Sequence, residues 1–552
     1  MQSFDSELLP RSPVRPWVAR IREASRFVPG RPIQAEALQG PRPTLFEFGL
    51  LGLCIAVAFG LRLTPLWSYS LWHDELYMLI TSQRSLVESL LQQVDYSAPL
   101  YQIVLRLLGC HAASPEWLLR LPAFVAGILC VAAAWWLARM LFGPIVAGLT
   151  GAFVAINPMQ VAISYQARPY TFYVLFSILS IAFIARLVRY GGGVNVAGYS
   201  LSSVLLLYSH YYGVFCIAAG GTFAVLSLIL DPSSRARVRP LIISFGLVGV
   251  ASLPACWLAL RFVAAGTPAT EGLPLATVGR CLNDLGVVFS ARDYAILLLV
   301  PCLAAVWPTE TTFDRGAVSS VSPPQSALAS WWTRRWPAIL LVVWCAFGIG
   351  VPLVLDRFFF HGGMSGLRYL VPMLVPALIL TIAFIDRLGR AALFLAVPVL
   401  AFLQFTSEYR AEWSNTGMRS LVEHLNTAPN LPPKILVSER AYAPDYVNPE
   451  VVGLQYYGFS RRPTEVLRIG WNTKTGRRKL PDDLQIENPE LLMDQPLPWI
   501  VSFSGWQAVE EYLRDQNIPL SKMTYGTVHL FRPVVSELPP SSGVPKRETS
   551  NQ

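Results

Sequence analysis

The chain has 552 residues, of which 53% are hydrophobic and 14% are charged, and its net charge is +9. Soluble domains carry about a quarter charged residues, so this composition excludes an ordinary soluble protein. Repeated apolar stretches of about 18 residues or more indicate a protein that crosses a membrane many times.

Residues 1–44 are rich in Arg and Pro and have no apolar core, so we interpret them as a cytoplasmic tail. Residues 45–408 are expected to form an all-α transmembrane domain. Its eleven expected spans are 45–63, 120–138, 145–163, 170–188, 196–211, 212–230, 241–262, 294–308, 337–356, 370–386 and 391–408.

Basic residues fall in every second connection between these spans, beginning with the N-terminal tail and Arg139. Short basic loops stay in the cytoplasm, so the N-terminus is predicted inside and, with eleven spans, the C-terminus outside. The positive charge then reflects this bias and contact with anionic lipid of the plasma (inner) membrane, rather than nucleic-acid binding.

The composition changes after Ser407, where lysines first appear. Helical patterns at 421–428 and 506–517, with strand patterns at 434–438, 499–503 and 526–533, predict a small extracytoplasmic α/β domain at 409–535. Residues 536–552 are expected to be a disordered tail.

The long first outer loop, 64–119, carries acids at the expected membrane edge. Asp74 and Glu75 directly follow the first span, Asp95 comes later, and an amphipathic interfacial helix is expected at 98–109. Carboxylates beside hydrocarbon cost several kcal/mol unless hydrated, paired or used. Asp74 and Glu75 are therefore functional candidates; the alternative is a solvated loop with two charges.

Further polar residues are expected at the same outer face. They are Arg120 at the start of the second span, Arg168 and Tyr170 after the third, His210 at the end of the fifth, and Arg368 and Tyr369 before the tenth. Arginine binds phosphate oxygens bidentately, carboxylates remove hydroxyl protons, and aromatic rings bind sugar faces or anchor the interface. Such a set suits group transfer from a lipid phosphate.

In chain order, the DE pair, APLYQ, ExxxRLP, YQARPY, YSHYYG and LRYLVPMLVP resemble the class C (GT-C fold) membrane glycosyltransferases. The likeness is to their bacterial branch, which includes protein O-mannosyltransferases, the lipid A aminoarabinose transferase and Rgt-type galacturonosyltransferases. It covers about residues 45–410. The resemblance implies transfer of a sugar from a polyprenyl-phosphate donor to a sugar, lipid or protein acceptor, with inversion and with no required cofactor.

The resemblance also implies residue roles. Asp74 becomes the catalytic carboxylate, Glu75 its supporting partner, and Arg120 the arginine that holds the lipid phosphate, with Arg168 and Arg368 as further candidates. Many relatives have Glu where this chain has Gln166.

Three alternatives stay open. His73, His210 and His361 could join the acids in binding a divalent metal, although no HxxxH spacing supports this. The chain could instead be a transporter or flippase of lipid-linked sugars, although polar residues at span ends and the lack of a visible repeat favour an enzyme. It could also be a non-catalytic relative.

Overall fold

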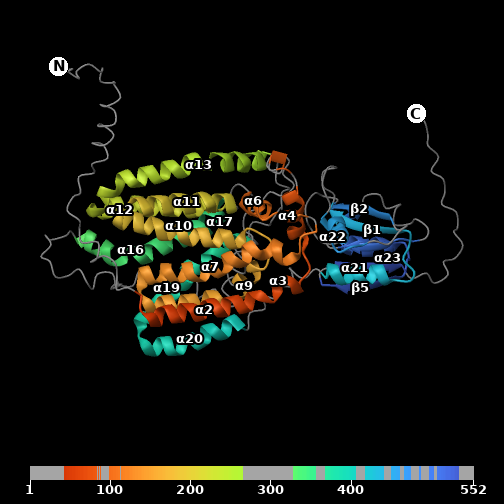
Figure 1. Cartoon of the computed structure of the whole chain (residues 1–552), viewed down its shortest axis with the longest axis horizontal. Coiled ribbons are helices and arrows are strands. Elements are labelled where there is room, and N and C mark those ends of the chain that lie inside the picture. The colour runs from red at the N-terminus through yellow and green to blue at the C-terminus, as the bar shows by residue number, and fades with distance from the viewer. Residues whose placement is uncertain are drawn as a thin grey trace, which may run out of the picture.

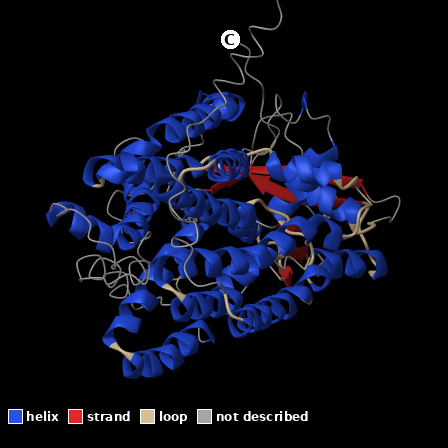
Figure 2. Ribbon diagram, turned by 60° about the vertical axis from the view of Figure 1, so that its left-hand side comes forward, coloured by secondary structure: helices blue, strands red, loops and turns tan. Residues whose placement is uncertain are grey.

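A computed structural model describes residues 43–83, 85, 87–88, 98–111, 113–264, 327–355, 367–405, 417–440, 449–459, 465–473, 484–486, 497–502, 506–526 and 528–533. Figure 1 shows a long helical domain on the left and a smaller α/β domain on the right. Figure 2 shows the strands gathered in the α/β domain alone.

The helical domain runs from residue 43 to residue 405. Its first half contains α2 (Leu45–Leu63), α3 (Pro65–Ser68), α4 (His73–Gln83), α6 (Leu100–Leu107), α7 (Glu116–Phe142), α8 (Pro144–Ile156), α9 (Pro158–Ser164), α10 (Tyr170–Tyr190) and α11 (Gly193–Ser209). Its second half contains α12 (Gly213–Leu230), η1 (Pro232–Arg237), α13 (Val238–Ala264), α16 (Ala327–Cys345), η3 (Ala346–Gly350), α17 (Val351–Leu355), α18 (Leu367–Leu370), η5 (Val371–Met373), α19 (Leu374–Leu388) and α20 (Arg390–Phe405).

Within the described residues, seven helices are long and apolar enough to cross a membrane, or eight if the bent pair α8–α9 is one span. Helices α7, α10 and α19 lie at the centre of the domain, with most of their spanning windows buried. Helices α2 and α13 instead turn apolar side chains such as Phe48, Ile242 and Val250 outward, as lipid-facing helices do. The expected span at 294–308 lies outside the described residues.

Two expected spans are shorter in the structure than a typical crossing helix of about 20 residues. Helix α11 has 17 residues, and the apolar part of α20 is Arg390–Phe402. The expected interfacial segment at 98–109 does contain a helix, α6.

The span expected at 145–163 is not continuous, because it bends by 59° between α8 and α9. Pro158 has no N–H and cannot continue the helical hydrogen bonding, and the Asn157 side chain caps α9 by accepting from the Gln160 N–H at 3.0 Å. The buried Arg62 donates to the freed carbonyls of Val154 (3.3 Å) and Ala155 (2.8 Å). The break is therefore stabilised by a side-chain cap and by Arg62.

The α/β domain is built on a six-stranded sheet in the order β3-β2-β1-β4-β6-β5. Its strands are β1 (Lys434–Arg440), β2 (Glu465–Thr473), β3 (Leu484–Ile486), β4 (Trp499–Ser502), β5 (Leu520–Tyr525) and β6 (Val528–Pro533). Strand β1 pairs in parallel with β2 and β4, and the other pairs are antiparallel.

Helices cover both faces of this sheet. Helix α23 (Trp506–Asp515) packs Val509 and Leu513 against Leu436 and Phe531 on one face. Helices α21 (Met418–Thr427) and α22 (Pro449–Tyr456) pack on the other face. In Figure 1, α22 is the part of this domain nearest to α4 of the helical domain, so the first long loop meets the α/β domain there.

Candidate active site

The predicted acids lie in the first turn of a helix, α4, rather than in an irregular loop. Trp72 is the N-cap, because its carbonyl accepts from the Leu76 N–H at 3.0 Å. Glu75, three residues on, reaches back with Oε2 to the Trp72 N–H at 3.1 Å, which is one half of a capping box. Negative charge is favourable at a helix N-terminus, so local chemistry explains why α4 starts here.

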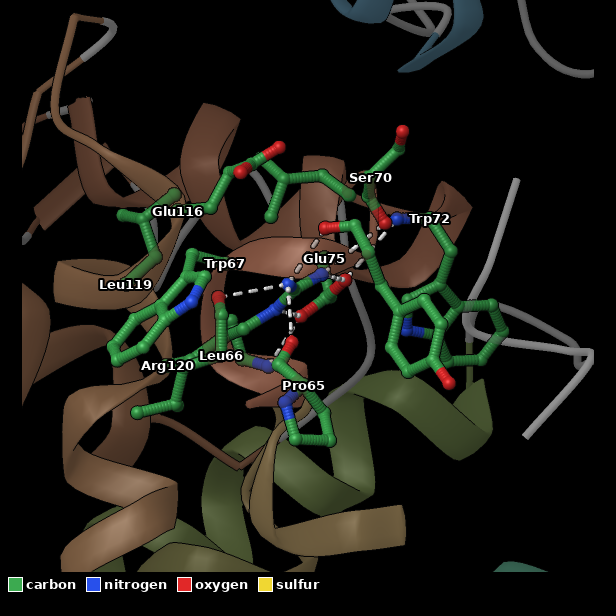
Figure 3. Close-up of polar contacts among 12 residues, drawn as sticks. Pro65, Leu66, Trp67, Ser70, Trp72, Glu75, Glu116, Leu119 and Arg120 are labelled. Atoms are coloured by element: carbon green, nitrogen blue, oxygen red, sulfur yellow. Dashed lines mark hydrogen bonds and ion pairs between the residues drawn. The ribbon is translucent and has the colours of Figure 1, made fainter. Parts of the chain in front are cut away.

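Glu75 forms a completely buried ion pair with Arg120 of α7 (Figure 3). Arg120 Nε donates to Glu75 Oε1 at 2.8 Å, and Arg120 Nη2 donates to Oε2 at 2.7 Å. Glu75 Oε1 also accepts from the Ala167 N–H at 2.7 Å. One carboxylate therefore ties together α4, α7 and the segment between α9 and α10.

Arg120 uses all five of its N–H donors within the protein. Beyond Glu75, it donates to the carbonyls of Leu66 (3.1 Å), Tyr69 (2.8 Å) and Ser70 (3.2 Å). The phosphate-binding role that the resemblance implies for Arg120 does not fit this geometry, because no donor points to an accessible oxygen site. Arg120 instead fixes the segment that leads into α4.

Asp74 and Arg168 form a second, more open pair beside the first. Arg168 Nε lies 3.9 Å from Asp74 Oδ2, and the two side chains are 9% and 16% exposed. Arg168 Nη1 also donates to the Asp74 carbonyl at 3.3 Å. The segment after α9 thus brings a cation to the N-terminus of α4, and this pair, unlike Glu75–Arg120, reaches solvent.

A cluster of aromatic side chains adjoins Arg168. The Arg168 guanidinium lies 5.8 Å from the Tyr170 ring centre. The His210 ring, in the turn between α11 and α12, stacks on Tyr173 at 4.7 Å and lies 5.3 Å from Tyr369. Tyr369 in turn stacks on Tyr212 at 4.5 Å. Residues from α10, the α11–α12 turn and α18 therefore meet at the same end of the domain.

His210 is held in its neutral form. Burial, and secondarily the positive charge of Arg168, lower the pKa of His210 to about 3. Its Nδ1 accepts from the Tyr212 N–H at 3.2 Å, which requires that nitrogen to be unprotonated. A neutral imidazole among tyrosines packs or donates a hydrogen bond but carries no charge near pH 7.

The structure describes the other predicted residues only in part. Asp95 and His361 lie outside the described residues, and Arg368 belongs to the short helix α18. Gln166 is buried, and its carbonyl accepts from the Arg168 N–H at 2.7 Å. Among the described residues, no three His, Cys, Asp or Glu side chains gather as a metal site.

Sequence reasoning quoted Glu116 only as part of the ExxxRLP motif and missed Arg419 and Tyr457. These three residues form a network beside the site. Glu116 pairs with Arg419 and accepts from the Tyr457 hydroxyl. Glu116 and Arg120 are four residues apart on α7, a spacing that places both on one helix face. That spacing was the available signal for Glu116; nothing in the sequence pointed to its partners in the α/β domain.

Comparison with known proteins identifies the fold. No protein-family model matches the chain, and no curated protein matches it in sequence. The structure of ArnT from Cupriavidus metallidurans bound to undecaprenyl phosphate is similar, with a TM-score of 0.50 and 14% identity over 89% of this chain and 99% of that chain. Its apo structure gives a TM-score of 0.49 and 15% identity, covering 88% of this chain and 97% of that chain.

The archaeal oligosaccharyltransferase AglB from Archaeoglobus fulgidus, in complex with an inhibitory peptide and a dolichol-phosphate, gives a TM-score of 0.45 and 12% identity, covering 90% of this chain and 75% of that chain. At these identities the likeness is one of fold. The ArnT similarity extends over both domains of this chain, and it confirms the fold that the ordered motifs predict, the GT-C fold.

Proposed function

We propose that the chain is a membrane glycosyltransferase that moves a sugar from a polyprenyl-phosphate carrier to a hydroxyl-bearing acceptor. The Asp74–Arg168 pair is the observation that carries this proposal. It joins an acid and a phosphate-binding cation, 94 residues apart in sequence, at a partly open position. The fold similarity to ArnT, whose structure holds undecaprenyl phosphate, supports the donor class.

The proposed reaction is a single displacement at the anomeric carbon. The acceptor oxygen forms a bond to that carbon while the bond to the carrier phosphate oxygen breaks, and the polyprenyl phosphate leaves with the electron pair. Asp74 accepts the acceptor's hydroxyl proton. Arg168 neutralises the charge that develops on the leaving phosphate. Displacement from the opposite side inverts the anomeric configuration.

The other charged pair takes a supporting role in this proposal. Glu75 and Arg120 are completely buried and bonded to each other, so they hold Asp74 in place without meeting the substrate. Tyr170 lies beside Arg168, His210 lies beside Tyr170, and Tyr369 lies beside His210; aromatic rings suit the face of a sugar. Arg368 and Asp95 remain further candidates for the phosphate and the sugar.

Transfer by reconstituted protein tests the proposal. Purified protein in proteoliposomes is given a radiolabelled polyprenyl-phosphate sugar and an envelope-lipid or glycan acceptor, and Asp74→Asn is compared with wild type. Asp386→Asn is the matched control, since Asp386 lies at the far end of α19 from the Tyr369 side, about 20 Å away by helical rise. We expect loss of transfer, by about 10²-fold or more, only in Asp74→Asn.

Two outcomes oppose this proposal. Equal transfer rates in Asp74→Asn and wild type remove Asp74 from the mechanism. Movement of intact labelled donor across the bilayer, with no sugar transferred, identifies a transporter of lipid-linked sugars instead.

A further inference from the structure

The α/β domain contacts the segment that leads into α4. The Tyr457 hydroxyl, directly after α22, accepts a hydrogen bond from the Leu71 N–H at 2.6 Å. Arg419, on α21, donates its backbone N–H to Ser70 Oγ at 3.2 Å and its Nη2 to the Trp67 carbonyl at 3.3 Å. Three contacts from the α/β domain therefore fall on residues 67–71, within seven residues of Asp74.

Both contacting residues are anchored on the start of α7 through Glu116. The Glu116 carboxylate pairs with Arg419 and accepts from the Tyr457 hydroxyl. Burial, followed by the negative charge of Glu116, raises the pKa of Tyr457, so its hydroxyl stays protonated and able to donate. The Tyr457 hydroxyl thus donates its single hydrogen to Glu116 of α7 and accepts a hydrogen bond from Leu71, in the segment that leads into α4.

The same segment is held from its other side by Arg120, through the carbonyls of Leu66, Tyr69 and Ser70. Ser70 therefore bonds to Arg120 through its carbonyl and to Arg419 through its hydroxyl. The next two backbone N–H groups of this segment are also bonded: the Leu71 N–H donates to the Tyr457 hydroxyl, and the Trp72 N–H donates to Glu75.

We infer that Tyr457 and Arg419 are positioning residues through which the α/β domain sets the place of Asp74 at the N-terminus of α4. This inference rests on the proposed function, because it assigns what these residues do for the proposed catalytic carboxylate. The α/β domain acts through the segment 66–72 and touches neither Asp74 nor Arg168 in these contacts. Because none of these contacts involves Arg168, which we assign to the donor phosphate, we expect their loss to act on kcat more than on the donor KM.

Loss of the Tyr457 hydroxyl leaves the Leu71 N–H and a Glu116 oxygen without this partner. A catalytic group displaced by about 1 Å loses about 10²-fold in rate. The expected signature is a fall in kcat with little change in the donor KM. A merely structural role lowers the amount of folded enzyme and leaves the kcat of the folded fraction unchanged.

Tyr456 provides the matched control, because it is the neighbouring tyrosine in the same domain contact. Its hydroxyl donates to the Ser114 carbonyl at 2.8 Å, which is not part of residues 66–72. Tyr457→Phe and Tyr456→Phe each delete one buried-interface hydroxyl with the same change of volume. Only the first deletion reaches the approach to α4.

The test compares wild type, Asp74→Asn, Tyr457→Phe and Tyr456→Phe by steady-state transfer and by amide hydrogen exchange of the peptide covering 66–76. For Tyr457→Phe we expect kcat to fall by roughly 10- to 100-fold with donor KM within about threefold, and exchange in 66–76 to accelerate. For Tyr456→Phe we expect both to stay near wild type. If Tyr457→Phe does not fold, Glu116→Leu removes the carboxylate that accepts from Tyr457 and pairs with Arg419, with a side chain of similar size.

The outcomes separate the two proposals. Wild-type transfer that depends on Asp74 but not on Tyr457 overturns the positioning inference and leaves the proposed function standing. Absence of transfer in wild type overturns the proposed function, and the exchange of 66–76 then decides the positioning inference by itself. Unchanged exchange in both Tyr457→Phe and Glu116→Leu overturns it.

Discussion

Glu75 and Arg120 form a bidentate, completely buried ion pair although 45 residues separate them in the sequence. Removing two charges from water is costly, and the pair is stable only because further hydrogen bonds complete both groups. Here Arg120 also donates to backbone carbonyls of the segment that leads into α4, such as that of Tyr69, and Glu75 also accepts from the Ala167 N–H. The pair consequently works as the fixed point to which three segments of the site are attached.

Neutralising either partner of this pair is expected to destabilise the protein strongly. Glu75→Gln or Arg120→Met leaves the other charge buried without its counterion, which costs about 3–5 kcal/mol. The measurement is thermal or denaturant unfolding in detergent. The control is Arg514→Met, because the Arg514–Glu510 pair is exposed at 70% and 28% and is expected to cost about 0.5 kcal/mol or less. Equal losses in the two pairs would contradict the buried-anchor interpretation.

Substitution of Arg168 is expected to affect donor use more than stability. Arg168→Gln removes the charge that we assign to the carrier phosphate, and the rate should fall by about 10²-fold or more. Arg168→Lys keeps the charge but loses the planar fork, so partial activity is expected. The measurements are transfer kinetics and binding of polyprenyl phosphate. Full donor affinity in Arg168→Gln would assign the phosphate to another cation.

The neutral state of His210 predicts a pH dependence of stability. Because burial and Arg168 lower its pKa to about 3, the unfolded chain binds the proton first, at its ordinary pKa of about 6.5. The His210 contribution is therefore complete above about pH 6.5 and decreases as the pH falls toward 3, by at most about 1.4 kcal/mol per unit.

His210→Asn tests this, since Asn retains an acceptor for the Tyr212 N–H and does not titrate. The measurement is Tm at pH 7.5 and pH 5. Wild type should lose more stability than the variant between these values. The same loss of stability in both proteins would show that groups other than His210 determine the stability at low pH.

Close packing of α7 against α9 predicts that Gly127 cannot be enlarged. A Cβ atom at Gly127 would lie 2.1 Å from Ser164 Oγ, whereas one at Gly52 of α2 would have nothing within 4 Å. Gly127→Ala is expected to cost about 1–3 kcal/mol, and Gly52→Ala is expected to be neutral or stabilising by up to about 1 kcal/mol. Unfolding in detergent measures both, and a neutral Gly127→Ala would mean that α9 can shift without cost.

Sequence patterns predicted the fold because the lengths of the apolar segments and the order of the motifs can be read directly along the chain. Asp74 and Arg168 were expected near each other since both fall at the same ends of spans, and the structure brings them to 3.9 Å. The bend at Asn157 was missed, although Pro158 marked it, because the segment 145–163 remains apolar on both sides of the break.

The role of Arg120 was harder to predict, because a sequence does not show which groups accept the hydrogen bonds of a side chain. An arginine that binds a phosphate and one that holds five protein acceptors have the same neighbours in the sequence. The Glu116–Tyr457 contact depends on how two domains dock, and 341 residues separate its members. No local pattern carries that information.

The broken span also has a consequence for how this protein is assembled. Arg62, near the end of α2, donates to the Ala58 carbonyl of its own helix, but its other acceptors, Val154, Ala155 and Ser164, come about a hundred residues later in the chain. During synthesis, newly made α2 therefore carries a charged side chain most of whose partners have not yet been made. The first helix should rest near the insertion machinery, with Arg62 hydrated, until the third membrane segment arrives and bends around it.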